Sequence, residues 1–285
     1  INAFLTGRAQ IQAKLAVNGP IMRISILAIP LAALVLTACA TTGRTDEEQA
    51  LAAELDARSI VPSTSQERTA IRGQDMLTQA TFWAEAHELN PSDLEAAYEL
   101  SNALRQLGNP QRAIEIAQQS LALHPGSPQL LLAYGTALTS TGRGTRATES
   151  LRRAAQAEPG NWRIFNTLGV AYEQGGQPDQ ARQNFRTALA LSPGEPAVMS
   201  NLALSHALSG EAETAERMLR EAMIRPGAEA AIRQNLALVI ALQGRFAEAE
   251  EVARYDVTPA MAESNMAYVR AMLTSRRSYD SLRGD

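Results

Sequence analysis

The chain has 285 residues, a formal net charge of −4 and a hydrophobic fraction of 45%. Its single cysteine, Cys39, cannot form a disulfide within the chain, and no cluster of cysteine and histidine suggests a metal site. An acidic chain also lacks the basic face that nucleic-acid binding requires. We therefore expect no internal disulfide, no metal, no cofactor and no nucleic-acid partner.

The segment 1–38 contains the features of a secretory signal. Polar sequence over residues 1–21 precedes Met22, and we interpret it as a mis-called upstream segment. Within residues 22–38, a basic residue is followed by an apolar run from Ile24 to Leu36. A run of about 13 residues is too short to span a bilayer, which takes about 20. It has the length of the apolar part of a signal peptide.

A short motif closes this segment. Leu36, Thr37, Ala38 and Cys39 resemble the lipobox of bacterial lipoproteins. The resemblance implies that the Cys39 thiol takes a diacylglycerol, that the chain is cut before Cys39, and that further acylation gives a lasting anchor. Ala40, rather than aspartate, follows the cysteine, which implies the outer membrane, facing the periplasm. The alternative is a plain buried cysteine.

We interpret the polar residues 39–66 as a tether between the lipid and the folded part. Its role is either reach across the periplasm or that of a simple spacer, and the sequence does not separate the two. From Cys39 onward the chain has 23 arginines, no lysine and 30 acidic residues, a formal charge of −7. Because the chain from Cys39 onward has no lysine, it can supply neither a lysine for a Schiff base nor a P-loop lysine.

In the rest of the chain, residues of the same type recur at a constant spacing in the sequence, called the repeat step below. The same step separates Gly108 from Gly142 and Ala113 from Ala147. The step predicts five helix pairs over 94–127, 128–161, 162–195, 196–229 and 230–263, inside a solenoid over 67–263. A degenerate unit, with Trp83 and Ala86 on its second helix, precedes residue 94. A capping helix and tail follow over 264–285. The glycines and alanines that keep the step are Gly108, Gly142, Gly176, Gly210 and Gly244, and Ala113, Ala147, Ala181, Ala215 and Ala249.

The repeat length, about 34 residues, and the residues of 162–195 resemble the tetratricopeptide repeat (TPR) family. The resemblance implies an all-α fold, a right-handed superhelical solenoid of antiparallel helix pairs. We expect glycines after the first helices to end them in left-handed geometry. We expect Gly135 and Gly169 to let paired helices approach closely. The residues that match the consensus are Phe165, Leu168, Gly169, Tyr172, Ala181, Phe185, Ala188 and Pro193.

In such arrays the first helices line a groove that binds peptides or partner helices. The alternative for each groove position is packing against the next unit. We do not expect the lysine-based carboxylate clamp of the chaperone-binding TPR class, because lysine is absent. The groove is expected to become more apolar toward its C-terminal half. The predicted groove residues are Tyr98, Asn102, Arg105, Leu132, Thr136, Asn166, Glu173, Ser200, Leu204, Gln234 and Leu238.

Nothing in the sequence predicts catalysis. His87, His124 and His206 are far apart in the chain, and no zinc-protease, nucleophile-elbow or phosphate-loop motif occurs. We therefore expect no catalytic residue, no enzymatic activity and no small-molecule substrate.

The lipobox, the repeats and the segment "SNMAYVRAML" over 264–273 together resemble the TadD-like lipoproteins of Tad/Flp pilus assembly. The resemblance implies a pilotin-like accessory role, with a secretin as the partner in the cell envelope. One alternative is a TPR lipoprotein scaffold for β-barrel assembly or for recruiting cell-wall enzymes. Another is a non-catalytic subunit of an envelope enzyme.

Overall fold

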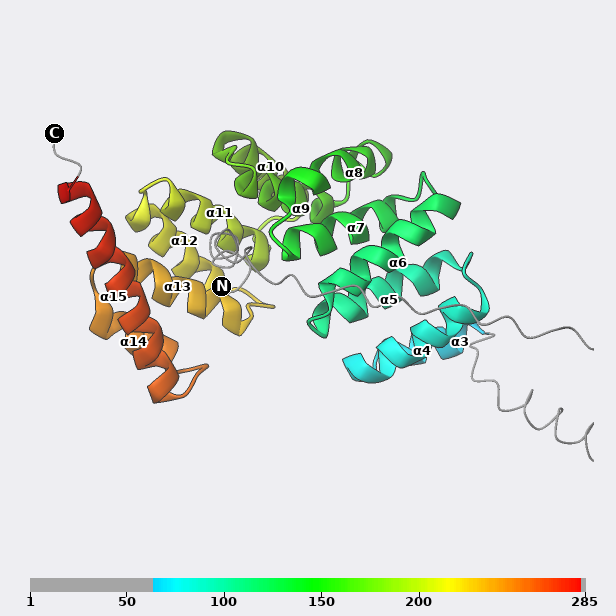
Figure 1. The fold of residues 1–285 in the computed structure, drawn as a ribbon, viewed down its shortest axis with the longest axis horizontal. Helices are drawn as coiled ribbons and strands as arrows, with labels where there is room; N and C mark the ends of the chain where they lie inside the picture. The colour runs from blue at the N-terminus through cyan, green and yellow to red at the C-terminus, as the bar shows by residue number, and fades with distance from the viewer. Residues whose placement is uncertain (1–63, 283–285) are drawn as a thin grey trace, which may run out of the picture.

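The computed structural model describes residues 64–282, with side chains as far as Thr274, and this part of the chain contains helices and turns but no strand. The helices stack in chain order into a curved array (Figure 1). The predicted all-α solenoid is confirmed. The helices are α3 (Ser65–Ile71), α4 (Met76–Leu89), α5 (Leu94–Gln106), α6 (Pro110–Leu123), α7 (Pro128–Ser140), α8 (Gly144–Ala157), α9 (Trp162–Gln174), α10 (Pro178–Leu191), α11 (Pro196–Leu208), α12 (Ala212–Met223), α13 (Ala230–Leu242), α14 (Phe246–Ala253) and α15 (Pro259–Leu282).

The helices form pairs that repeat along the array. The pairs α5–α6, α7–α8, α9–α10, α11–α12 and α13–α14 are neighbours both in the chain and in space. Their first helices begin at Leu94, Pro128, Trp162, Pro196 and Ala230, each one repeat step after the last. Each first helix also contacts the first helix of the next pair, so that the odd-numbered helices form one continuous face.

The turn after α5 shows why the repeat glycines are required. Gly108 has a φ of +80°, where a Cβ would be strained, and it ends α5 in left-handed geometry as predicted. The Gly108 N–H donates to the Arg105 carbonyl at 3.1 Å, and the Asn109 N–H donates to the Leu104 carbonyl at 2.9 Å. This pair of bonds satisfies carbonyls at the helix end. The Asn109 side chain then caps α6, whose first residue is proline.

Small residues set the distance between the two helices of a pair. A Cβ added at Gly135 would lie 2.5 Å from Leu151 Cδ2, and one added at Gly169 would lie 2.4 Å from Phe185 Cε1. Leu151 and Phe185 are fully buried and fill the space that the glycines leave. The predicted close approach at both glycines is confirmed.

The N-terminal end of the array is closed by a short helix that is held by charge. In α3, Arg68 donates to Asp93 Oδ2 at 2.5 Å and to Glu95 Oε2 at 2.6 Å. The Arg68 guanidinium also lies 5.6 Å from the centre of the Trp83 ring. Trp83 itself is fully buried against α5, so α4 and α3 together cover the apolar face of the first pair.

The C-terminal end differs in detail from the expected one. The second helix of the last pair, α14, has only 8 residues, and α15 begins at Pro259, ahead of residue 264 where we expected the cap to start. Pro259 lies within the unit predicted over 230–263 but is the first residue of α15. Proline also fits the first turn of a helix, where its missing N–H has no partner to lose. The Thr258 hydroxyl accepts from the Met261 N–H at 3.3 Å and caps α15 there.

The lipobox at Leu36–Cys39, the signal segment and the tether up to residue 63 lie outside the described residues. Within residues 64–282, none of the helices is both long enough and apolar enough to span a bilayer.

Candidate binding groove

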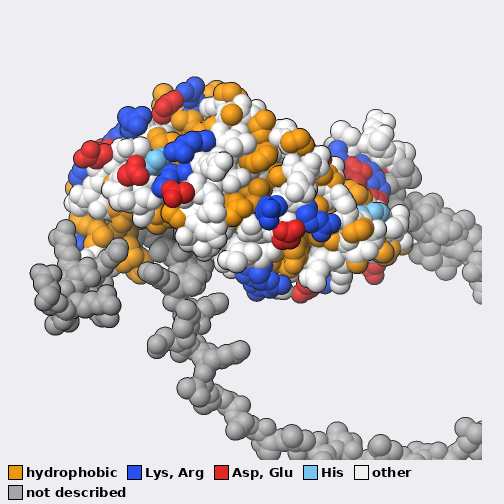
Figure 2. Space-filling model, turned by 90° about the horizontal axis from the view of Figure 1, so that it is seen from above, with side chains coloured by type: hydrophobic (Ala, Val, Ile, Leu, Met, Phe, Trp, Pro, Cys, Tyr) orange, Lys and Arg blue, Asp and Glu red, His pale blue; other side chains and the backbone are white. Residues whose placement is uncertain are grey.

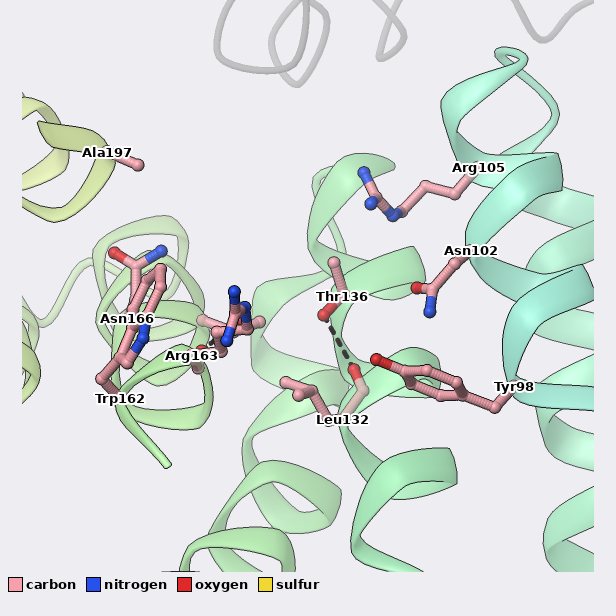
Figure 3. Close-up of a pocket in the computed structure, with 10 residues that line it drawn as sticks. Tyr98, Asn102, Arg105, Leu132, Thr136, Trp162, Arg163, Asn166 and Ala197 are labelled. Carbon is pink, nitrogen blue, oxygen red and sulfur yellow. Dashed lines mark hydrogen bonds between the residues drawn. The ribbon is translucent and has the colours of Figure 1, made fainter. Parts of the chain in front are cut away.

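An open cavity of about 280 Å³ lies on the face formed by the first helices. Its lining comes from α5, α7 and α9, with one residue of α11 at the far end (Figure 3). The lining residues are Tyr98, Asn102, Arg105, Leu132, Thr136, Trp162, Arg163, Asn166, Thr167 and Ala197.

Six of the eleven predicted groove residues line this cavity. Tyr98, Asn102 and Arg105 come from α5, Leu132 and Thr136 from α7, and Asn166 from α9. Figure 3 shows the three α5 side chains extending toward α7 and α9.

Sequence reasoning missed four lining residues: Trp162, Arg163, Thr167 and Ala197. Two of them, Trp162 and Arg163, are the first residues of α9. An aromatic residue beside an arginine at the start of a predicted helix was the available signal.

Arg105 is the most unusual residue of the cavity. It is half-buried, it makes no hydrogen bond or ion pair, and its Nε atom is buried without a partner. Burial lowers the pKa of Arg105, against a smaller opposing effect of Tyr98. Among the arginines whose side chains are described, the others without a polar or aromatic partner are all exposed, namely Arg143, Arg146, Arg186 and Arg217.

A second guanidinium lies in the same cavity. Arg163 is exposed and sits 4.6 Å from the centre of the Trp162 ring. None of the ten lining residues is acidic, although acidic residues outnumber basic ones in the chain. The cavity is therefore locally cationic.

The polar groups around the two arginines are only partly used within the protein. The Thr136 hydroxyl donates to the Leu132 carbonyl at 2.8 Å (Figure 3). The Asn166 side-chain oxygen accepts from Asn201 Nδ2 at 2.9 Å, which leaves the Asn166 NH₂ group to a ligand. Asn102 is half-buried and makes no side-chain hydrogen bond in the described part of the chain. The cavity thus offers several donors and little negative charge.

Glu173 lies near the end of α9, outside the lining of the cavity. Its Oε2 atom is buried and makes no hydrogen bond.

The remaining predicted groove residues, on α11 and α13, are used in packing. Ser200 is buried and accepts from Asn235 Nδ2 at 3.0 Å. The Gln234 amide donates to the Ala253 carbonyl at 3.2 Å. Leu204 and Leu238 are half-buried in the apolar cluster around α13. These four residues contact the neighbouring helices.

The three histidines have separate surroundings. His124 Nε2 lies 2.8 Å from the Ser92 carbonyl, and His206 Nδ1 lies 3.0 Å from Glu211 Oε2. Burial is the main cause of the lowered pKa of His87, whose Nδ1 is buried without a partner. In the described part of the chain, no three residues among His, Cys, Asp and Glu are placed to hold a metal ion.

Charged side chains of both signs lie close together on the face of the described array that Figure 2 shows. Figure 2 shows arginines and acidic residues in small mixed groups, with apolar surface between them. One such group joins Glu216 on α12 to Arg220 at 2.8 Å and to Arg245 at 2.7 Å.

Comparison with known proteins agrees with this architecture. One tetratricopeptide repeat family model matches residues 80–128, 98–161 and 132–196, a second matches 173–227 and a third matches 228–254. Together they span residues 80–254, which is more than half of the chain. A comparison with curated proteins finds no match.

Several solved structures are similar to this chain. TTC0263, a thermophilic TPR protein of Thermus thermophilus, is 21% identical with a TM-score of 0.55, over 62% of this chain and 98% of that one. PilF of Pseudomonas aeruginosa is 20% identical with a TM-score of 0.46, over 73% and 85%. MamA of Desulfovibrio magneticus RS-1 is 24% identical with a TM-score of 0.46, over 55% and 88%. At these identities the likeness concerns the fold alone, and the family models carry the assignment: the chain belongs to the tetratricopeptide repeat family.

Proposed function

We propose that this protein is a lipid-anchored scaffold on the periplasmic face of the outer membrane, whose groove holds a segment of another protein of the cell envelope. The observation that carries the binding function is the cavity on α5, α7 and α9. It is open, it lies on the face that TPR arrays use for binding, and it contains polar side chains without partners. Unpaired half-buried polar groups cost stability, and a ligand that pairs with them offsets that cost.

The anchor rests on the sequence alone. The apolar run that ends at the Leu36–Cys39 motif supports lipidation of Cys39 and export through the inner membrane. Replacing Cys39 with alanine should therefore remove the protein from the outer-membrane fraction, while the folded array is unchanged. A Cys39→Ala protein that still sediments with outer membranes contradicts the lipid anchor.

The process that the scaffold serves is proposed from the family resemblance. The combination of a lipobox, TPR units and the 264–273 segment supports a pilotin-like role in assembling the secretin of a Tad/Flp pilus. In the fold, that segment lies within α15, the helix that closes the C-terminal end of the array. The proposed partner-binding groove on α5, α7 and α9 and the segment that resembles the TadD-like lipoproteins therefore lie in different parts of the protein.

The direct test is purification of the tagged full chain from detergent-solubilised outer membranes, with identification of the proteins that come with it. The same purification is carried out with the variant Thr136→Trp, in which a large side chain on α7 fills the cavity and should block binding. Recovery of a secretin with the parent chain, and its loss with the variant, supports both the groove and the pilus role. Recovery of barrel-assembly or cell-wall proteins moves the function to the alternative scaffolds. Equal recovery with both chains contradicts the groove.

A further inference from the structure

The helix α15 is built as the first helix of a further unit, but it lacks a second helix at the place where the earlier units have one. It packs on α13 and α14, as each earlier first helix packs on the pair before it. It has 24 residues where α13 has 13, and it continues as a helix through residue 278 to Leu282. Residue 278 is a serine, one repeat step after the last of the glycines whose positive φ ends the earlier first helices, namely Gly108, Gly142, Gly176, Gly210 and Gly244. The turn that would bring a second helix back onto α15 is therefore absent there.

The eighth position of the first helices reports the contact between the two helices of a unit. In the five complete units this position is small and buried, and its residues are Ser101, Gly135, Gly169, Ala203 and Ala237. Gly135 lies against Leu151, on the second helix of its own unit. Gly169 lies against Phe185 in the same way. The same position in α15 is Ala271, and it is exposed.

The fourth position behaves in the same way. It is buried in α5, α7 and α11, where it holds Ala97, Leu131 and Met199. In α15 it is Ala267, which is exposed. Ala267 and Ala271 are about one helical turn apart on one side of α15, which lies across the end of the array (Figure 1). We call the surface around these two residues the open face of α15.

We propose that the open face of α15 binds the open face of a second copy of this protein, so that two antiparallel α15 helices pack about a two-fold axis near Ala267. Each helix then takes the place of the second helix that the other lacks. The contact lies at the C-terminal end of the array, away from the cavity on α5, α7 and α9, and is separate from the binding proposed there.

The charged edge of the open face favours a second copy as the occupant. Glu263 and Arg270 lie about two turns apart along this edge, and both are exposed. Neither makes an ion pair with a described side chain, although the Arg270 guanidinium lies 4.5 Å from the centre of the Phe246 ring. Because a two-fold axis near Ala267 lies between the two charges, it brings Glu263 of each copy opposite Arg270 of the other. Opposite charges along the edges of a helix pair determine partner choice and orientation.

The other edge of the open face is apolar and favours the antiparallel orientation. Met261 and Tyr268 lie about two turns apart along it, with exposures of 53% and 57%. An antiparallel copy places this apolar edge beside the same edge of the other helix. A parallel copy would place it beside Glu263 and Arg270, and would bury charge against apolar side chains. Only the antiparallel pair therefore matches both edges.

The first test is disulfide cross-linking of the full chain in detergent micelles. Cys39 is the only cysteine of the chain, so Ala267→Cys introduces one thiol into α15, and the parent chain controls for Cys39. We expect oxidation to convert most of the Ala267→Cys protein to a species of twice the mass, because residues near a two-fold axis lie opposite each other within the reach of a disulfide. The matched control is Ala190→Cys, at an exposed alanine on α10, and it should stay at the mass of one chain.

The second test exchanges the charges. Glu263→Arg should weaken dimerisation about 10-fold, because Arg270 of the other copy then meets a like charge. Adding Arg270→Glu to the same chain should restore the dissociation constant of the parent to within about 3-fold, because opposite charges face each other again. The constant is measured by sedimentation of a dilution series, and thermal unfolding checks that each variant is folded. Within one chain Glu263 and Arg270 form no ion pair, so this restoration reports a contact between copies.

Three results would overturn the proposal. The first is cross-linking of Ala267→Cys no greater than that of Ala190→Cys. The second is a double variant that dimerises no better than Glu263→Arg. The third, from oxidation in intact outer membranes, is a cross-link from Ala267→Cys to a protein of another mass, which shows that a different protein covers the open face. Thr136→Trp, which fills the cavity on α5, α7 and α9, should leave the cross-link unchanged, so failure of the groove and failure of the dimer are distinguished.

Discussion

Replacing Arg105 with methionine should make the folded protein more stable, although the same change should weaken partner binding. The substitution keeps an unbranched side chain of similar reach and removes the charge. A buried donor without a partner costs about 1–3 kcal/mol. Arg105 is half-buried rather than fully enclosed, and only its Nε atom is completely cut off from solvent and partners. We therefore expect a gain near the lower limit, about 1 kcal/mol.

A gain of about 1 kcal/mol corresponds to a rise in the melting temperature of about 2–4 °C for a folded region of this size. The measurement is thermal unfolding of the parent and the variant followed by far-ultraviolet circular dichroism. The matched control is Arg68→Met, in which the same change removes an arginine paired with Asp93 and Glu95. That variant should melt lower than the parent, because it leaves Asp93 without its ion-pair partner, whereas Glu95 still pairs with Arg72.

The opposite signs of the two shifts are the critical result. When a residue that contributes to folding is replaced, the protein becomes less stable. When a residue retained for binding is replaced, the protein often becomes more stable. If Arg105→Met lowers the melting temperature as much as Arg68→Met does, then Arg105 contributes to folding, and the reasoning that assigns it to a ligand is refuted.

Three further predictions concern the packing and the ends of the array. Gly169→Ala should destabilise the protein by about 1–3 kcal/mol in urea unfolding, because the new Cβ meets the ring of Phe185, whereas Gly160→Ala, with no atom within 4 Å, should have little effect. Phe185→Ala should cost about 3–5 kcal/mol in the same assay, because it leaves a cavity beside Gly169. The hydrogen bond from Arg233 is the main cause of the lowered pKa of Asp256, so this pair stabilises the fold above the unfolded pKa of about 3.9 and loses that effect as the pH falls through the folded pKa. Asp256→Asn should therefore melt lower than the parent at pH 7 and no differently near pH 2, and an equal difference at both pH values would contradict the pairing.

The sequence was sufficient for the features that depend on local chemistry repeated at a constant step. A glycine such as Gly108 ends a helix in left-handed geometry whatever surrounds it, and its recurrence once in every repeat determines where the helices turn. The close approach at Gly135 and Gly169 follows from the same kind of reasoning, since a side chain of any size would separate the paired helices.

The repeat spacing could not predict which of the groove positions line the cavity and which pack against neighbouring helices. The fifth position of the first helices holds Tyr98, Asn166, Ser200 and Gln234 in four of the units, yet the first two line the cavity and the last two bond to neighbouring helices. Whether such a side chain faces solvent depends on the next helices. Gln234 finds its partners at Ala253 and Asp256 because α14 ends early, and nothing in the repeat predicts that early end.

The two halves of the described array therefore differ in how they use one repeated surface. Across α11 and α13, side chains on the first helices satisfy one another, as Asn235 does with Ser200, and apolar residues such as Leu204 and Leu238 join the core cluster. Across α5, α7 and α9, Arg105 and Asn102 remain without partners. A half-buried polar group without a partner is a cost in the free protein, so the presence of Arg105 and Asn102 in one cavity favours a binding site there.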